Sequence, residues 1–174
     1  MFSVRTSPTD GPHSADEVVV PGRASERQLL DLARRGATGV KPWSSPLPLT
    51  ERQYQLLERT ADHELWVIYW PVDVGLLLHD HGGSAGAFHV VDGLLEETST
   101  TLRGRRLRRR RIGPGQGKFF GPEYVHSIVN PAGGPATSVH AYSPPLTSMT
   151  FYSRCRAGLI VSGVVTDWDG APPD

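Results

Sequence analysis

The sequence predicts an all-β domain with one short helical segment near its N-terminus. Turn formers are abundant, with 19 glycines and 15 prolines among 174 residues, and they separate short stretches rich in β-branched and aromatic residues. The clearest such stretch, residues 64–70, reads Glu-Leu-Trp-Val-Ile-Tyr-Trp and stops at Pro71, which cannot continue a central strand. Residues 26–35, by contrast, show the apolar spacing of a helix.

Length and composition predict a single soluble domain. The chain carries 18 basic and 18 acidic residues, so no net field attracts nucleic acid or membranes. Its single cysteine, Cys155, excludes an intramolecular disulfide and suits a reducing compartment. Neither a signal peptide nor an apolar run of about 20 residues is evident. We expect a cytoplasmic monomer or weak homo-oligomer without nucleic-acid or membrane partners.

The chain divides into three parts. Residues 1–24 are rich in Ser, Pro, Asp and Gly and are expected to form a disordered arm. Residues 25–166 form the single domain, and residues 167–174 are a polar tail. The domain begins with a helix that Ser25 caps and Gly36 ends. Residues 51–59 fit either a helix or a strand. Later strands are expected at 118–120, 124–129, 138–142, 149–155 and 159–165.

Seven arginines lie within the nine positions from Arg103 to Arg111. Such a run can be a nucleic-acid patch, or an exposed strand whose arginines face Glu96 and Glu97 across a hairpin. No aromatic residue lies among the arginines to stack on bases. We therefore favour the exposed strand.

A metal clamp is predicted where His79 and His81 lie one residue apart. On an extended segment both side chains point the same way, so the two imidazoles can hold one ion. Three leucines precede them, and a Gly-Gly-Ser-Ala-Gly run follows as a tight turn. A second strand then ends at Gly93, so this region is expected to form a hairpin with the clamp on its first strand.

His126 is the best candidate for a third ligand. It follows a Gly-Pro turn signal and precedes Asn130. An early His-x-His strand with a late lone histidine resembles the two-part signature of the cupin superfamily, which implies an antiparallel jelly-roll barrel with both parts lining its mouth. Taken alone, the His-x-His pair could equally have a surface or structural role.

Three neutral imidazoles would leave the ion its full charge. Many metal cupins carry a glutamate shortly after the His-x-His pair, but Ala85 and Gly86 stand there. The set thus differs from the two-histidine, one-carboxylate triad of many ferrous oxygenases. An ion so held favours an anionic substrate, and a thiolate qualifies. The same set would also suit Zn²⁺.

Longer motifs resemble the cysteine dioxygenase family over roughly residues 50–155. They are His79-Asp-His81-Gly-Gly-Ser84-x-Gly86, Val91-x-Gly93-x-Leu95-x-Glu97, His126-Ser-Ile-x-Asn130 and Ser138-Val-His140-Ala-Tyr142-Ser-Pro-Pro145. The resemblance implies that His79, His81 and His126 bind Fe(II), and that both atoms of O₂ are added to a small thiol to give a sulfinic acid.

Ser138, His140 and Tyr142 lie two apart on one expected strand, so all three face the same space. The resemblance implies a hydrogen-bonded relay that presents the Tyr142 hydroxyl to the substrate. The alternative is a row of polar side chains that satisfy one another inside the barrel.

Two positions depart from the family pattern. Gly86 stands where animal members carry a cysteine crosslinked to the tyrosine. Tyr54 stands where the family places its carboxylate-binding arginine, a residue whose planar fork grips carboxylates. Arg52, two residues earlier on the same face of a strand, could replace it. Other candidates are Arg59, Arg154 and Arg156. The substrate is therefore expected to be L-cysteine or a related mercapto acid, bound near Arg52, Tyr54 and Tyr142.

Two other functions are compatible with these motifs. One is a different metal-dependent cupin enzyme that works without O₂. The other is a non-catalytic cupin module that binds or regulates a partner, for instance nucleic acid through the arginine run. Neither explains the Ser138, His140 and Tyr142 row.

Overall fold

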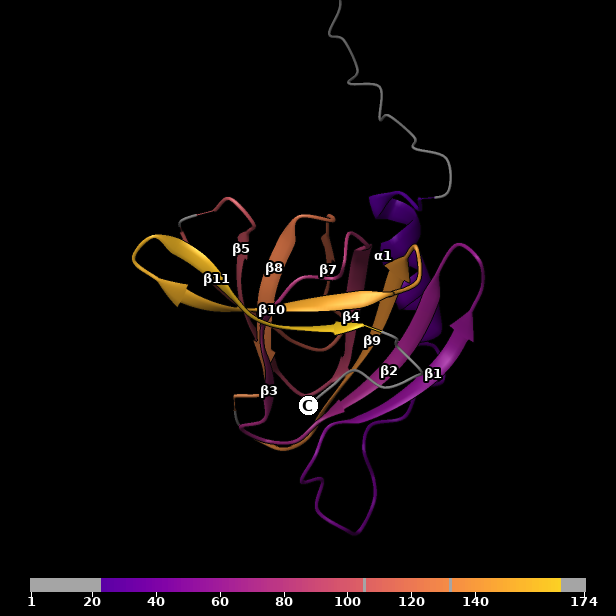
Figure 1. Ribbon diagram of the computed structural model, residues 1–174. Helices are drawn as coiled ribbons and strands as arrows, with labels where there is room; N and C mark the ends of the chain where they lie inside the picture. Colours follow the sequence, from indigo (N-terminus) through magenta and orange to yellow (C-terminus); the bar gives the residue numbers. More distant parts are fainter. Residues whose placement is uncertain (1–22, 105, 132, 167–174) are drawn as a thin grey trace, which may run out of the picture.

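The computed structural model describes residues 23–104, 106–131 and 133–166. Of the predicted arm, only Arg23 and Ala24 fall within these ranges, and the predicted tail lies outside them. The described residues contain one helix and eleven strands (Figure 1). The bounds are α1 (Glu26–Gly36), β1 (Gln53–Arg59), β2 (Glu64–Trp70), β3 (Gly75–His79), β4 (Ala85–Asp92), β5 (Leu95–Thr101), β6 (Arg108–Ile112), β7 (Gly117–Phe120), β8 (Tyr124–Val129), β9 (Ala136–Ser143), β10 (Ser148–Cys155) and β11 (Gly158–Thr166).

The strands form two antiparallel sheets, which confirms the all-β prediction. One sheet has the order β1-β2-β9-β4-β7 and the other β11-β10-β3-β8-β5-β6. Their inner faces enclose the main core, to which Trp66 and Phe88 contribute from the first sheet and Leu95 and Ile128 from the second. Strands far apart in sequence are neighbours in both sheets, so the functional segments meet between the two layers.

Helix α1 packs on the outer face of the five-stranded sheet (Figure 1). Leu29 and Ala33 are fully buried there. Ser25 and Gln28 form a reciprocal capping box at the N-terminus. Gly36 is the last helical residue and Ala37 is the C-cap, so the predicted boundary is correct to one residue. This helix is neither long nor apolar enough to cross a membrane.

The segment that fitted either helix or strand is strand β1. It pairs with β2 in antiparallel register, with Tyr54 opposite Ile68. This pairing with a buried neighbour decides the conformation, which the local sequence left open. Tyr54 and the residue before the strand, Arg52, therefore lie at the edge of the five-stranded sheet.

The predicted hairpin of β3 and β4 was wrong. Strand β3 pairs with β8 and β10, whereas β4 pairs with β9 and β7, so the two strands belong to different sheets. The turn between them carries the chain across the barrel. Gly82 has φ 58°, and a Cβ there would lie 2.3 Å from Ser148 Oγ. The turn therefore fits closely against β10, and glycine is required at this point.

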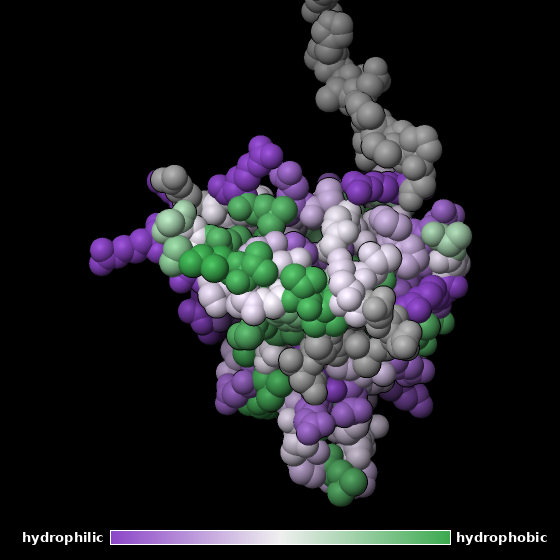
Figure 2. All heavy atoms as spheres, in the orientation of Figure 1, coloured by the Kyte–Doolittle hydropathy of each residue, from purple (hydrophilic) through white to green (hydrophobic). Residues whose placement is uncertain are grey.

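The arginine run is only partly a strand, since β6 spans Arg108–Ile112. It pairs with β5, and Arg109 and Arg111 form ion pairs with Glu96, as predicted. Glu97 does not join them, because successive side chains of a strand face opposite sides. It points instead into the barrel. At the far end of the same sheet, Ile160, Val161 and Val164 of β11 are exposed and contribute to the apolar surface in Figure 2.

Candidate metal centre

Three buried histidines converge between the sheets. Their candidate ligand atoms all lie within 4.8 Å of one another, and none of the three residues is more than 2% exposed. His79 and His126 lie opposite each other on the paired strands β3 and β8. His81 lies in the turn just after β3, and its Nε2 is 3.2 Å from Nε2 of His126. The structure thus brings together the three predicted ligands.

Hydrogen bonds fix which nitrogens can bind an ion. His79 Nδ1 lies 2.7 Å from the Leu77 carbonyl oxygen, and His126 Nδ1 lies 2.8 Å from Glu97 Oε1. Each Nδ1 must carry the proton it donates, so each Nε2 keeps its lone pair. Burial lowers the pKa of His79 to about 4 and holds the pKa values of His81 and His126 well below the usual value. Neutral imidazoles with converging lone pairs fit a divalent transition metal.

Asp80 holds the two clamp histidines in place although the strand ends at His79. Its Oδ1 accepts hydrogen bonds from the backbone N–H groups of Gly82 and Thr150, at 3.0 and 3.2 Å. Its Oδ2 accepts a bond of 2.6 Å from the Tyr152 hydroxyl. The carboxylate therefore ties the turn to β10, and the residues on either side of Asp80 both belong to the histidine cluster.

We expect Asp80→Ala to weaken metal binding by roughly 10–100-fold, the usual effect of losing a group that orients ligands. Titration of the metal-free protein with Co²⁺ or Zn²⁺ measures the change. Asp92→Ala, at the end of β4, is the matched control and should bind normally. An Asp80→Ala variant with unchanged affinity would show that the turn holds its shape without this carboxylate.

The predicted polar row forms a continuous hydrogen-bonded chain on β9. Trp70 Nε1 donates to Ser138 Oγ at 2.8 Å, and Ser138 Oγ lies 2.9 Å from His140 Nε2. His140 Nδ1 lies 3.3 Å from the Tyr142 hydroxyl. Ser138 accepts from Trp70 and can donate its own proton to His140 Nε2. In that tautomer His140 Nδ1 donates to the tyrosine oxygen.

This arrangement leaves the Tyr142 proton free to point into the cavity. Burial lowers the pKa of His140 to about 3, so this imidazole stays neutral and has a single N–H to donate. Burial also raises the pKa of Tyr142, which keeps the phenol protonated. The Tyr142 ring lies 5.4 Å from the His81 ring. The hydroxyl donor therefore borders the histidine cluster.

A small cavity of about 20 Å³ lies beside the histidines. Both predicted substrate-binding residues on the β1 side, Arg52 and Tyr54, line it. The Arg52 guanidinium carbon lies 5.3 Å from the Tyr54 ring centroid and 5.7 Å from that of Trp70. The other residues that line the cavity carry apolar, aromatic or imidazole side chains: Trp66, Ile68, Trp70, Leu76, His79, His126, Ile128, His140, Tyr142, Leu146 and Met149.

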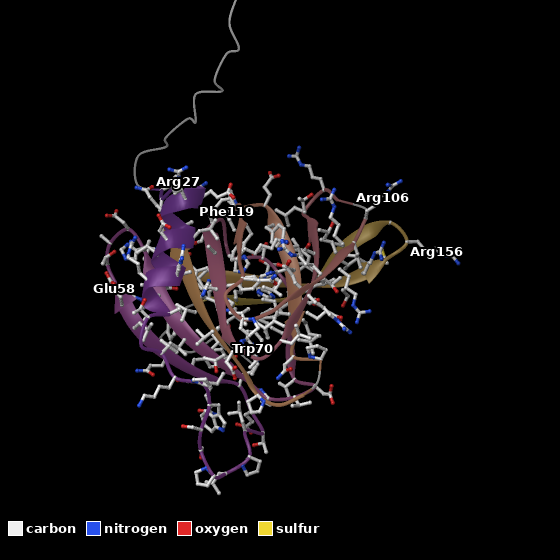
Figure 3. The ribbon with its side chains drawn as sticks, turned by 180° about the vertical axis from the view of Figure 1, so that it is seen from behind. Arg27, Glu58, Trp70, Arg106, Phe119 and Arg156 are labelled. Carbon is white, nitrogen blue, oxygen red and sulfur yellow. The ribbon has the colours of Figure 1, made fainter. Side chains whose placement is uncertain are left out.

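Arg52 supplies a positively charged side chain to the lining of this cavity. It is only 5% exposed. Its charge adds to the effect of burial in lowering the pKa of His79, and it opposes the rise in the pKa of Tyr142. The other candidate arginines lie elsewhere. Arg59 pairs with Glu64 at 2.8 Å. Arg154 and Arg156 border a separate surface depression near the β10–β11 turn, and Figure 3 shows Arg156 at the periphery, well away from Trp70.

Gly86 leaves room for an aromatic ring beside the site. A Cβ at this position would lie 2.5 Å from Phe120 and 2.9 Å from the Ala141 carbonyl oxygen. Phe120 itself stacks on His81, with ring centroids 4.5 Å apart. His81 Nδ1 is buried and has no hydrogen-bond partner among the described residues. Phe120 and the Asp80 turn therefore hold the His81 ring in its orientation.

A group missed by the sequence interpretation is Glu97, which was placed opposite the arginines. Its side chain is buried, accepts the Nδ1 proton of His126 and pairs with Lys118. A signal was present: adjacent residues on a strand cannot both face the arginines, so one of Glu96 and Glu97 had to face inward.

Comparison with known proteins identifies the family. The model for cysteine dioxygenase type I matches residues 47–155. The chain belongs to this family. The match to cysteine dioxygenase type I includes all three histidines of the cluster, the Ser138, His140 and Tyr142 row, and both Arg52 and Tyr54. Together with the three-histidine cluster, it makes this chain a metal-binding cupin enzyme.

Several solved structures resemble this cysteine dioxygenase family member at low sequence identity. A protein from Bacillus halodurans is 13% identical over 53% of this chain and 70% of its own, with a TM-score of 0.50. KdgF from Halomonas sp. is 19% identical over 53% of this chain and 78% of its own, with a TM-score of 0.47. An oxalate oxidase in complex with glycolate is 16% identical over 59% and 55%, with a TM-score of 0.49.

Proposed function

We propose that the protein is an Fe(II)-dependent thiol dioxygenase that converts L-cysteine or a related mercapto acid, with one O₂, into the sulfinic acid. Both oxygen atoms are added to sulfur, which is oxidised as O₂ is reduced, so no further reductant is needed. The observation that carries the proposal is a cavity beside the histidine cluster that is lined by His79, His126, Arg52 and Tyr142. Each of these groups matches one part of such a substrate.

The ligand set fits a metal ion whose positive charge is not neutralised by a carboxylate of the protein. His79, His81 and His126 are neutral, and the cavity lining contains no carboxylate. The ion would supply a Lewis-acidic centre that binds the thiolate and activates O₂. Three imidazoles would also suit Zn²⁺, and membership of the cysteine dioxygenase type I family supports iron.

Arg52 supports recognition of a carboxylate. It is buried beside the metal ligands, and it keeps its positive charge at any physiological pH. A mercapto acid offers one anion to the ion and a second to the guanidinium. Tyr54 and Trp70 flank the guanidinium and limit how it can turn.

Tyr142 supports the proton-handling part of the reaction. With its Nδ1 protonated, His140 donates to the Tyr142 oxygen 3.3 Å away, and the phenolic proton is then directed into the cavity. There it can donate to the substrate sulfur or to an oxygen atom that is being transferred. Ser138 and Trp70 keep His140 in the tautomer this requires.

We expect Tyr142→Phe to slow turnover by about 100-fold, the lower range for loss of a positioned proton donor, while metal content stays the same. Oxygen-electrode rates and metal analysis on the same sample measure both quantities. Tyr69→Phe, on β2 and outside the cavity, is the control. An unchanged rate in Tyr142→Phe would remove this hydroxyl from the reaction.

The proposal is tested by oxygen consumption of the protein, loaded with iron in the absence of air. The thiols are cysteine, 3-mercaptopropionate, cysteamine and a thiol with neither amine nor carboxylate. Sulfinate formed at one O₂ per thiol, with a carboxylate-bearing thiol preferred, is the expected result. Iron-loaded protein that consumes no O₂ with any of these thiols would overturn the proposal.

A further inference from the structure

A buried chain of charged groups lies behind His126. The Glu97 side chain is 1% exposed; its Oε1 accepts the His126 Nδ1 proton at 2.8 Å and its Oε2 accepts from Lys118 Nζ at 2.6 Å. Lys118 comes from β7 of the opposite sheet and is 20% exposed. Its ammonium also contacts the Tyr124 hydroxyl and lies 4.6 Å from that ring's centroid. Lys118 thus reaches the metal ligand through a single carboxylate.

We propose that Lys118 is a positioning residue that sets the reduction potential of the bound metal by moderating the charge that Glu97 places on His126. The inference rests on the proposed iron site, but not on the identity of the substrate. It depends on a local arrangement in which one lysine, one carboxylate and one imidazole are joined by two hydrogen bonds.

The sign of the effect follows from simple electrostatics. A carboxylate that accepts the Nδ1 proton draws it away from the ring, which makes Nε2 a stronger donor to the metal. Stronger donation, and the negative charge itself, stabilise Fe(III) relative to Fe(II) and lower the potential. The Lys118 ammonium pulls charge from Glu97 and offsets both effects. Because the site is buried, solvent screens these interactions only weakly.

This role suits a metal with no anionic protein ligand. Glu97 is the acidic group hydrogen-bonded to His126, and Lys118 governs how much of its charge this ligand receives. Without Lys118, His126 would carry the full influence of the carboxylate. The ferrous form, which binds and activates O₂ in the proposed reaction, would then be easier to oxidise without substrate.

A purely structural role makes a different prediction. Lys118 and Glu97 join the two sheets, so the pair also stabilises the fold. A stabilising ion pair would change the unfolding temperature when broken, but it would leave the potential of the metal in the folded protein unchanged. The potential therefore separates the two roles.

The test measures the midpoint potential of the iron-loaded protein without any thiol, so it gives a result whether or not the protein oxidises thiols. We expect Lys118→Met to lower the potential, equivalent to an increase of about tenfold in the affinity for Fe(III) relative to Fe(II). Glu97→Gln should raise it, and Lys118→Arg, which keeps the charge, should stay near the wild-type value. Lys41→Met replaces the only other lysine, which is exposed in the connector before β1, and should have no effect.

The double variant decides whether Lys118 acts through Glu97. In the Glu97→Gln background, Lys118→Met should cause little further shift, because the charge that it moderates is gone. A shift of the same size in both backgrounds, or a potential that Lys118→Met leaves unchanged or raises, would overturn the proposal. If Lys118→Met does not fold, Glu97→Gln alone decides, since an unchanged potential there removes the carboxylate through which Lys118 is proposed to act.

Discussion

His81→Ala is expected to yield a folded protein that no longer retains a stoichiometric transition metal and has no dioxygenase activity. Loss of an outer group that merely orients a ligand costs roughly 10–100-fold in affinity, and loss of a ligand should cost more. His81 is the cleanest of the three to remove, because its Nδ1 has no hydrogen-bond partner among the described residues. Metal analysis after dialysis measures the loss.

The matched control for this variant is His89→Ala. His89 lies half-buried on β4, outside the cluster, so this variant should bind metal as the wild type does. His126→Ala should also lose the metal, but it strands the buried Glu97 carboxylate and should lower the unfolding temperature as well. Stoichiometric metal in His81→Ala would show that the ligand set is assigned wrongly.

Arg52→Met is expected to lower kcat/KM for a mercapto acid by about 100- to 1,000-fold, the usual cost of removing one partner of a buried charge pair. Cysteamine has no carboxylate, so its oxidation should not be slowed by this change. Arg52→Lys should recover only part of the loss, because an ammonium lacks the planar fork that binds a carboxylate through two hydrogen bonds. Steady-state oxygen consumption with both thiols measures the difference.

Arg27→Met controls for the loss of one arginine, because Arg27 is exposed on α1 and peripheral in Figure 3. It should behave as the wild type with each thiol. An equal loss with mercapto acid and cysteamine in Arg52→Met would mean that Arg52 shapes the cavity rather than binding the carboxylate.

Local patterns were enough to predict the groups that lie close together in sequence. Three of these predictions depend only on spacing along one segment, and the structure contains all three arrangements. They are the His79 and His81 pair, the alternating row from Ser138 to Tyr142, and the Ser25 cap. The pairing of His79 with His126 depended on the family resemblance, because no local signal brings β3 and β8 together.

The errors concern contacts between distant segments. The turn after His81 has the length of a hairpin turn, yet it crosses from one sheet to the other, because Gly82 fits against Ser148 of β10. Glu97 was assigned to the arginines although the alternation of a strand allows only one of Glu96 and Glu97 to face them. Its contact with Lys118 across the barrel cannot be read from neighbouring residues. The placement of Arg52 stayed open until β1 was known to be a strand.

The site is divided between two walls. His79 and His126 belong to the six-stranded sheet, Tyr142 to the five-stranded sheet and Arg52 to its edge, while His81 lies on the crossing between them. The distance from metal to proton donor is therefore the thickness of the barrel's interior, which core side chains such as Phe88 and Met149 set. A core substitution far from every functional group could leave each wall intact and still separate the two. In such an enzyme catalytic rate would fail before metal binding, so metal content alone would be a poor measure of an active preparation.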